Sequence, residues 1–146
     1  MGGYLATLVA QVRAEIEATY LMAPGFNFLE RWMRSLKLDY DNETCWESKI
    51  PIFHYRYDET RYICTDIFKD ANNWSPIALS RKVPARIVHG IHDAVVPIDE
   101  SKKFVSGRPW CSLKELDTDH GLLSHLGWVV DDCIAFFKKL GILSTE

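Results

Sequence analysis

The stretch that decides the fold is Ile87-Val-His-Gly-Ile-His-Asp-Ala-Val-Val-Pro97. It begins inside a short apolar run, Ala85-Arg-Ile-Val-His89, which predicts a buried strand. Gly90 then marks a turn, and Asp93 follows shortly after it. A carboxylate delivered just beyond a strand end can accept the N–H of an imidazole and fix the tautomer and orientation of that ring. Asp93 is therefore a candidate acid for a catalytic pair.

A histidine stands in the equivalent place after the next predicted strand. The stretch Leu113-Lys-Glu-Leu-Asp-Thr-Asp-His-Gly121 ends a strand expected at residues 112–116 and presents His120 just beyond it. The 27 positions from Asp93 to His120 have room for one helix, predicted at Ile98–Val105, and one strand. Such a crossover joins two parallel strands, so we expect both side chains at the same edge of a sheet.

The remaining periodicities predict further helices alternating with short strands. Apolar residues at helical spacing predict a first helix from residue 2 to about residue 19, followed by a strand at residues 19–23. A final helix carries an apolar face from Val129 to Leu140 and ends at Gly141. This alternation is typical of an α/β fold with a mainly parallel sheet, here of about three strands.

Together, the two loops resemble the acid and histidine loops of α/β-hydrolases. In that family the strand before the acid ends in His-Gly, a carboxylate follows a few residues later, and Val-Pro opens the next helix. The order of Asp93 before His120 also agrees with the family's Ser, Asp, His order. The resemblance implies a partial α/β-hydrolase fold, similar to small bacterial esterases or thioesterases with a short cap, in which Asp93 and His120 belong to the catalytic triad.

The N-terminus, Met1-Gly-Gly-Tyr-Leu-Ala6, resembles the second half of the family's nucleophile elbow, Gly-x-Ser-Met-Gly-Gly-Tyr. In that motif the Ser immediately precedes the Met, and the N–H of the residue after the Ser donates to the oxyanion. The resemblance therefore implies that Met1 contributes to the oxyanion hole. No Ser of this chain stands in a Gly-x-Ser-x-Gly context. We expect the natural chain to start upstream of an internal Met1 and to include the Ser.

The predicted strand at residues 19–23 raises the question of what pairs with it. In the family this strand pairs with the nucleophile strand, and without that partner its edge is open. An open apolar edge is a template for pairing, and Tyr20-Leu-Met-Ala23 contains no charge or Pro to protect it. We expect the edge to be covered by upstream chain, by a partner, or by self-association.

An aromatic-rich insert is expected at about residues 26–75, within a single incomplete domain that spans residues 1–146. Eleven of the chain's 18 aromatic residues lie between positions 26 and 74. The pattern predicts a helix over Phe28–Leu36, an extended segment over residues 50–57 and a helix over residues 59–72. The rings either line a substrate pocket under a cap or fill the core of a small subdomain. The candidates for substrate binding are Phe26, Trp32, Trp46 and Phe53.

A metal site would need the histidines around the acid to act as ligands. His89, His92 and His120 are candidates, but a strand followed by a turn does not place the first two on one helix face as the His-Glu-x-x-His motif does. The sequence therefore favours no metal and no organic cofactor. The four cysteines are scattered without a Cys-x-x-Cys pair, so we expect reduced thiols.

Simpler interpretations exist for the polar residues of both loops. In the simpler interpretation Asp93 is a turn-forming residue at a strand end, and His120 is a surface imidazole. Asp117 and Asp119 could pair or raise the basicity of His120, or simply be solvated. His125, near the final helix, is expected at the surface.

Composition and charge limit the classes of partner. A formal net charge of -3 without any long basic run argues against nucleic acid and anionic membranes. No stretch approaches about 18 consecutive apolar residues, and the N-terminus does not resemble a secretion signal. We expect a cytoplasmic protein.

The sequence thus predicts a serine hydrolase that cleaves carboxylic esters or thioesters by acyl transfer to a Ser expected upstream of Met1. His120 would be the general base and then the general acid, and Asp93 would orient it. The competing prediction is a non-catalytic α/β-hydrolase remnant that binds a small ligand or a partner.

Overall fold

The computed structural model describes residues 1–37, 49–54, 57–74 and 79–144. The chain divides into two compact units. The first comprises Met1–Phe26 and Leu79–Glu146, and the second comprises Asn27–Ala78.

Three parallel strands form the sheet of the first unit, in the order β1-β4-β5. Their bounds are β1 at Thr19–Met22, β4 at Ala85–Gly90 and β5 at Cys111–Leu116. The first residue of β4 pairs with the first residues of both neighbours, so the three strands begin at one edge of the sheet. Their carboxyl ends consequently meet at the opposite edge, which is the arrangement that the sequence predicted.

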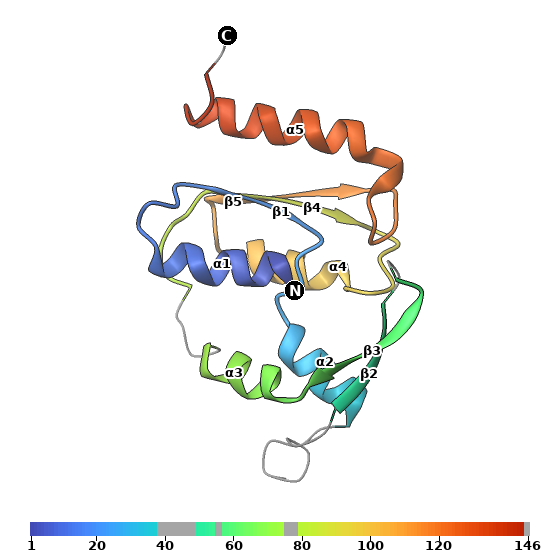
Figure 1. The fold of residues 1–146 in the computed structure, drawn as a ribbon. Coiled ribbons are helices and arrows are strands. Elements are labelled where there is room, and N and C mark those ends of the chain that lie inside the picture. The colour runs from blue at the N-terminus through green and yellow to red at the C-terminus, as the bar shows by residue number, and fades with distance from the viewer. Residues whose placement is uncertain (38–48, 55–56, 75–78, 145–146) are drawn as a thin grey trace. The chain divides into compact units, whose positions relative to one another are not determined.

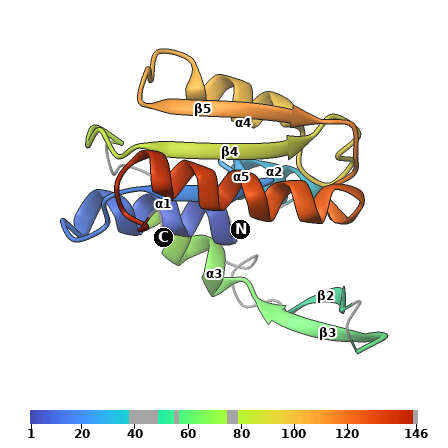
Figure 2. The same ribbon diagram turned by 90° about the horizontal axis from the view of Figure 1, so that it is seen from above.

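Helices cover both faces of this sheet (Figure 1). α1 (Gly2–Val12) and α4 (Ile98–Val105) lie on one face, and α5 (Leu126–Lys139) lies on the other. Viewed from above, α5 runs along the direction of the strands (Figure 2). A short 3-10 helix, Leu123–His125, leads into α5. Gly141 follows the end of α5 and has a φ of 71°. A positive φ is favourable for glycine, so the predicted helix stop is confirmed.

A small apolar cluster joins this sheet to α5. It consists of Val88, Leu116, Leu122 and Val129, with Tyr20 packed against it. β4 is the middle strand, and its residues from Ile87 to Gly90 are buried because helices cover both faces of the sheet. The apolar run that identified this strand in the sequence therefore reflects burial on two sides.

The second unit combines a hairpin with two helices. α2 spans Phe28–Leu36, β2 spans Lys49–His54, β3 spans Glu59–Cys64 and α3 spans Asp66–Trp74. β2 and β3 pair antiparallel, with Lys49 opposite Cys64 and His54 opposite Glu59. The core of this unit consists of Phe28, Met33, Ile50 and Phe68.

Two predicted helices differ from the structure. The first ends at Val12 rather than near residue 19. The helix predicted over residues 59–72 is wrong in its first half, where β3 forms instead, and α3 begins only at Asp66. β-Branched and aromatic residues such as Thr60, Tyr62 and Ile63 favour a strand once β2 is available to pair with it.

Within the described residues, no helix is both long enough and apolar enough to cross a lipid bilayer.

Candidate active site

The acid loop leaves β4 at its carboxyl end and turns back so that Asp93 is buried. The side chain of Asp93 has 0% of its surface exposed. Its Oδ1 accepts hydrogen bonds from the backbone N–H groups of Val95 at 2.8 Å and Val96 at 2.7 Å. Backbone donors of this kind fix a carboxylate in one orientation and stabilise its ionised form.

His120 lies beyond β5, and its ring faces the other oxygen of the same carboxylate. His120 Nδ1 is 2.7 Å from Asp93 Oδ2. An ionised carboxylate can only accept, so Nδ1 carries the proton of this bond. In the neutral ring Nε2 then has the free lone pair, and 43% of the His120 side chain is exposed. This is the geometry of a general base whose second nitrogen is held by an acid.

The pKa of Asp93 reflects opposing influences. Desolvation is the largest and raises this pKa. The hydrogen bonds from Val96, His120 and Val95 act in the other direction, and together they lower the pKa of Asp93 below its ordinary value. The carboxylate is therefore ionised at neutral pH, as its role opposite an imidazole N–H requires.

Gly90 allows the two loops to approach each other. A Cβ on Gly90 would lie 2.3 Å from the carbonyl oxygen of Thr118 and 2.5 Å from that of Asp119. The backbone N–H of His92 also donates to the Thr118 carbonyl at 3.1 Å. The backbones after β4 and β5 are thus in close contact, which places Asp93 within reach of His120.

The histidine loop is anchored at Leu122. This residue has a positive φ of 55°, which is uncommon for a residue with a side chain, yet 1% of its surface is exposed. Burial of its side chain beside Val88 and Val129 offsets the cost of that conformation. Gly121 N–H also donates to Asp119 Oδ1 at 3.0 Å, which closes the turn that carries His120.

His89 is a site residue whose role the sequence did not predict. Its Nε2 lies 3.1 Å from Asp93 Oδ2 and 2.9 Å from the carbonyl oxygen of Val96, while its Nδ1 lies 2.8 Å from Ser101 Oγ. The sequence offered His89 only as a metal ligand. Its position at the end of a buried strand, four residues before the acid, was the available signal.

Met1 precedes α1 at the same edge of the sheet. Its carbonyl accepts the N–H groups of Tyr4 at 3.0 Å and Leu5 at 3.2 Å, so it begins the helix. A Cβ on Gly3 would lie 2.7 Å from Cβ of Pro24, which follows β1. The start of α1 therefore packs against the carboxyl end of β1, and the role of Met1 in an oxyanion hole stays a prediction.

The structure describes the side-chain surroundings of two of the four aromatic candidates, Phe26 and Trp32. Phe26 belongs to the first unit and stacks on Phe104 of α4 with ring centroids 3.8 Å apart. Trp32 belongs to the second unit and packs against Phe28 and Phe68. Trp46 lies outside the described residues, as does the side chain of Phe53. Trp32 thus contributes to the core of its own unit, and substrate binding by these rings stays a prediction.

The other polar residues of the two loops have separate partners. His92 Nε2 lies 2.8 Å from Asp117 Oδ1, and both side chains are exposed. His125 Nδ1 lies 3.0 Å from Ser124 Oγ. Among the described residues, no group of three or more His, Cys, Asp or Glu is arranged to hold a metal ion. His89 and His92 are directed to different carboxylates rather than to one point.

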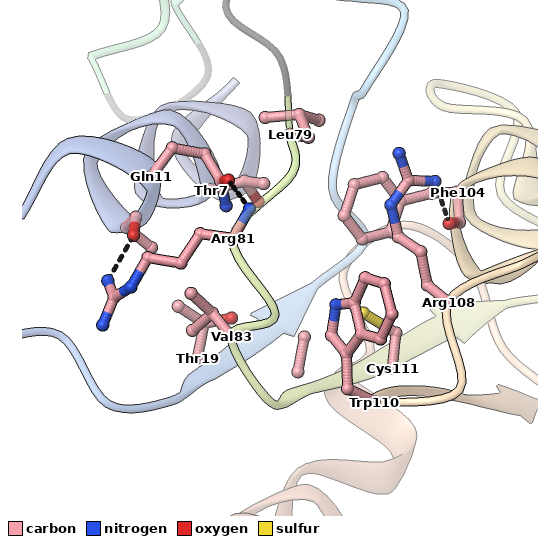
Figure 3. A pocket seen from close by; sticks show the side chains of 12 residues that line it. Thr7, Gln11, Thr19, Leu79, Arg81, Val83, Phe104, Arg108, Trp110 and Cys111 are labelled. Carbon is pink, nitrogen blue, oxygen red and sulfur yellow. Dashed lines mark hydrogen bonds between the residues drawn. The ribbon is translucent and has the colours of Figure 1, made fainter. Parts of the chain in front are cut away.

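Two hollows in the first unit lie at the amino ends of the strands, away from Asp93 and His120. One is a cavity of about 20 Å³ between α1, α4 and the first residues of the strands (Figure 3). That volume corresponds to about one water molecule. The other, about 480 Å³, lies between Trp110, Arg86 and the last turns of α5. Neither can hold a substrate against His120.

Comparison with known proteins agrees with this architecture. No protein-family model matches the chain, and no curated protein matches it significantly. Among solved structures, Est1E from Butyrivibrio proteoclasticus superposes with a TM-score of 0.74 at 21% sequence identity, over 94% of this chain. The chain has the α/β-hydrolase fold. It spans 57% of the length of Est1E, so it corresponds to part of that structure.

Proposed function

We propose that this chain carries the acid and the general base of a serine hydrolase that cleaves carboxylic esters or thioesters. The nucleophile is a Ser immediately before Met1. The observation that supports this proposal is the 2.7 Å hydrogen bond between His120 Nδ1 and a buried, ionised Asp93. A hydrogen bond of this kind leaves Nε2 free to take a proton from a hydroxyl group.

The reaction is an acyl transfer in two halves. The Ser oxygen attacks the carbonyl carbon while His120 Nε2 takes the hydroxyl proton, and the N–H of Met1 donates to the oxyanion. The C–O or C–S bond then breaks, and His120 returns the proton to the leaving alcohol or thiol. Water attacks the acyl-enzyme while His120 takes one of its protons. The bond between the acyl carbon and the Ser oxygen then breaks, His120 returns the proton to Ser, and the carboxylic acid leaves. Asp93 holds the imidazole throughout, and no metal or organic cofactor takes part.

The test is labelling with a fluorophosphonate, which requires an activated Ser. In the protein from its native source, we expect an intact mass above 16.8 kDa and a labelled peptide in which Ser precedes Met1. His120→Ala and Asp93→Asn should each slow labelling by about 10⁴-fold. His125→Ala, which removes a histidine that contacts Ser124, is the matched control and should label normally.

A folded protein that the probe does not label would contradict this proposal. It would favour the non-catalytic alternative, an α/β-hydrolase remnant that binds a small ligand or a partner. Leu5, Val9 and Val12 support that alternative, because they follow one another along one face of α1 and are all exposed.

A further inference from the structure

His89 occupies a buried position where an apolar side chain would be expected. Its neighbours along β4, Ile87 and Val88, are buried apolar residues, and both His89 and Ser101 have 0% of their surface exposed. Burying an imidazole is costly unless its nitrogens find partners. Here Nε2 contacts Asp93 Oδ2 and the Val96 carbonyl, and Nδ1 contacts Ser101 Oγ.

The chemistry of these partners assigns the protons on the ring. A carbonyl and an ionised carboxylate only accept, so Nε2 of His89 must carry a hydrogen. In the neutral ring, Nδ1 is then the acceptor of the Ser101 hydroxyl proton. His89 is therefore held in the Nε2–H tautomer, whereas the contact of His120 with Asp93 requires the opposite, Nδ1–H tautomer.

We propose that His89 is a positioning residue for the Asp93–His120 pair, and that Ser101 of α4 holds it in place. The catalytic consequence of this role rests on the proposed function. Each oxygen of Asp93 then has two donors: Oδ1 has the N–H groups of Val95 and Val96, and Oδ2 has His120 and His89. The carboxylate cannot rotate without breaking bonds on both oxygens.

The bond from His89 has a specific effect on His120. Without it, Oδ2 has a single donor and the carboxylate is free to tilt toward its backbone partners. His120 would then lose its fixed tautomer, because only a correctly directed Asp93 favours Nδ1–H over Nε2–H. By analogy with the residues that orient metal ligands, we expect the loss of His89 to cost about 10–100-fold in activity.

The test reads the ring nitrogens of this chain directly by NMR with ¹⁵N-labelled histidine. We expect His89 as a single Nε2–H tautomer whose proton exchanges slowly with water, and His120 mainly as Nδ1–H. In His89→Gln the side-chain amide can still donate to Asp93, so His120 should keep its tautomer. In His89→Asn the shorter amide reaches toward Ser101 and not Asp93, so His120 should become a mixture of tautomers.

The control is His92→Ala, which removes the neighbouring contact with Asp117 and should leave His120 unchanged. Circular dichroism and urea unfolding show that each variant is folded. If His89 carries its proton on Nδ1, or if His120 has the wild-type tautomer in folded His89→Asn, the proposal is wrong.

The two proposals can fail separately. The NMR experiment uses a chain without the nucleophile, so it tests His89 whether or not acyl transfer occurs. In the native protein that contains the Ser, His89→Asn should reduce the rate of fluorophosphonate labelling about 10–100-fold and His89→Gln much less. If the wild-type protein is labelled and His120 keeps its tautomer in His89→Asn, only the role of His89 is refuted.

Discussion

The two ends of the three-stranded sheet use charged side chains in opposite ways. At the carboxyl end, the carboxylate of Asp93 accepts four hydrogen bonds, two from backbone and two from histidines. At the amino end, the guanidinium of Arg81 donates four hydrogen bonds of 2.6 to 2.8 Å to backbone carbonyls at and after the end of α1. Figure 3 shows Arg81 beside Gln11 and the small cavity.

The two hydrogen-bond networks differ in the group at which each one ends. The network of Asp93 ends in the exposed ring of His120, so one side of it is open to solvent and to a reacting molecule. The network of Arg81 ends in backbone carbonyls. It holds the segment after α1 against Arg81, which lies shortly before β4 begins at Ala85. The carboxyl end thus presents an accessible imidazole, whereas the charge at the amino end is used within the fold.

The largest loss of stability is expected when a side chain fills the space between the acid loop and the histidine loop. Gly90→Ala would place a Cβ 2.3 Å from the Thr118 carbonyl oxygen, so the backbone of the histidine loop must move. We expect a loss of about 3 kcal/mol in the free energy of unfolding, measured with urea. His120 should also separate from Asp93, which NMR of its ring would show as a mixture of tautomers.

The control for this variant is Gly127→Ala in α5, where a Cβ would meet nothing within 4 Å. This change should stabilise the protein by about 0.5–1 kcal/mol, because alanine loses less backbone freedom in a helix. A Gly90→Ala variant as stable as wild type would mean that the loops are not held this close.

A smaller effect is expected at the amino end. Arg81→Ala removes all four hydrogen bonds to the carbonyls after α1 and should lower the free energy of unfolding by about 2 kcal/mol. Arg81→Lys keeps the charge but not the fork of donors, so it should recover only part of the loss. Both variants should keep the wild-type tautomer of His120, and a change there would show that the two ends are coupled.

The sequence predicted the carboxyl end well because strand ends in a parallel sheet share an edge. Once residues 85–89 and 112–116 were predicted to be consecutive parallel strands, Asp93 and His120 were expected side by side, and the observed strands pair in parallel. Short strands that are buried on both faces are continuous apolar runs in the sequence. The sequence therefore predicted β4, the middle strand, within one residue of its observed bounds. The likeness in fold to Est1E agrees with that prediction.

The sequence could not predict features that depend on distant partners. Arg81 contacts Ala10 and Ile16, which lie 71 and 65 positions away, and no local pattern marks such a contact. β3 forms because β2 lies opposite it, and the spacing of its apolar residues alone suggested a helix. The role of His89 likewise appears only when α4 brings Ser101 to its ring.

The smallest effect concerns a third charged network, which joins α5 to the sheet near the first residues of the strands. Asp132 of α5 accepts two hydrogen bonds from Arg86, at 2.8 and 2.9 Å, and one from the Tyr20 hydroxyl at 2.9 Å. Desolvation raises the pKa of Asp132, but the bonds from Arg86 and Tyr20 outweigh it, so the pKa is below its ordinary value. Burial, and then the bond to Asp132, raises the pKa of Tyr20.

Because the pKa of Asp132 is lower in the folded than in the unfolded state, its contribution to stability is complete above the unfolded pKa of about 4. It disappears as the pH falls through the lower, folded pKa. Asp132→Asn should therefore cost about 1.5 kcal/mol at pH 7, and less as the solution is acidified below about pH 4. The measurement is urea unfolding of both proteins from pH 7 to pH 3. Since Asp93 is the same in both, its own titration cancels in the difference. A cost that stays constant down to pH 3 would mean that α5 is held by the shape of this contact and not by its charge.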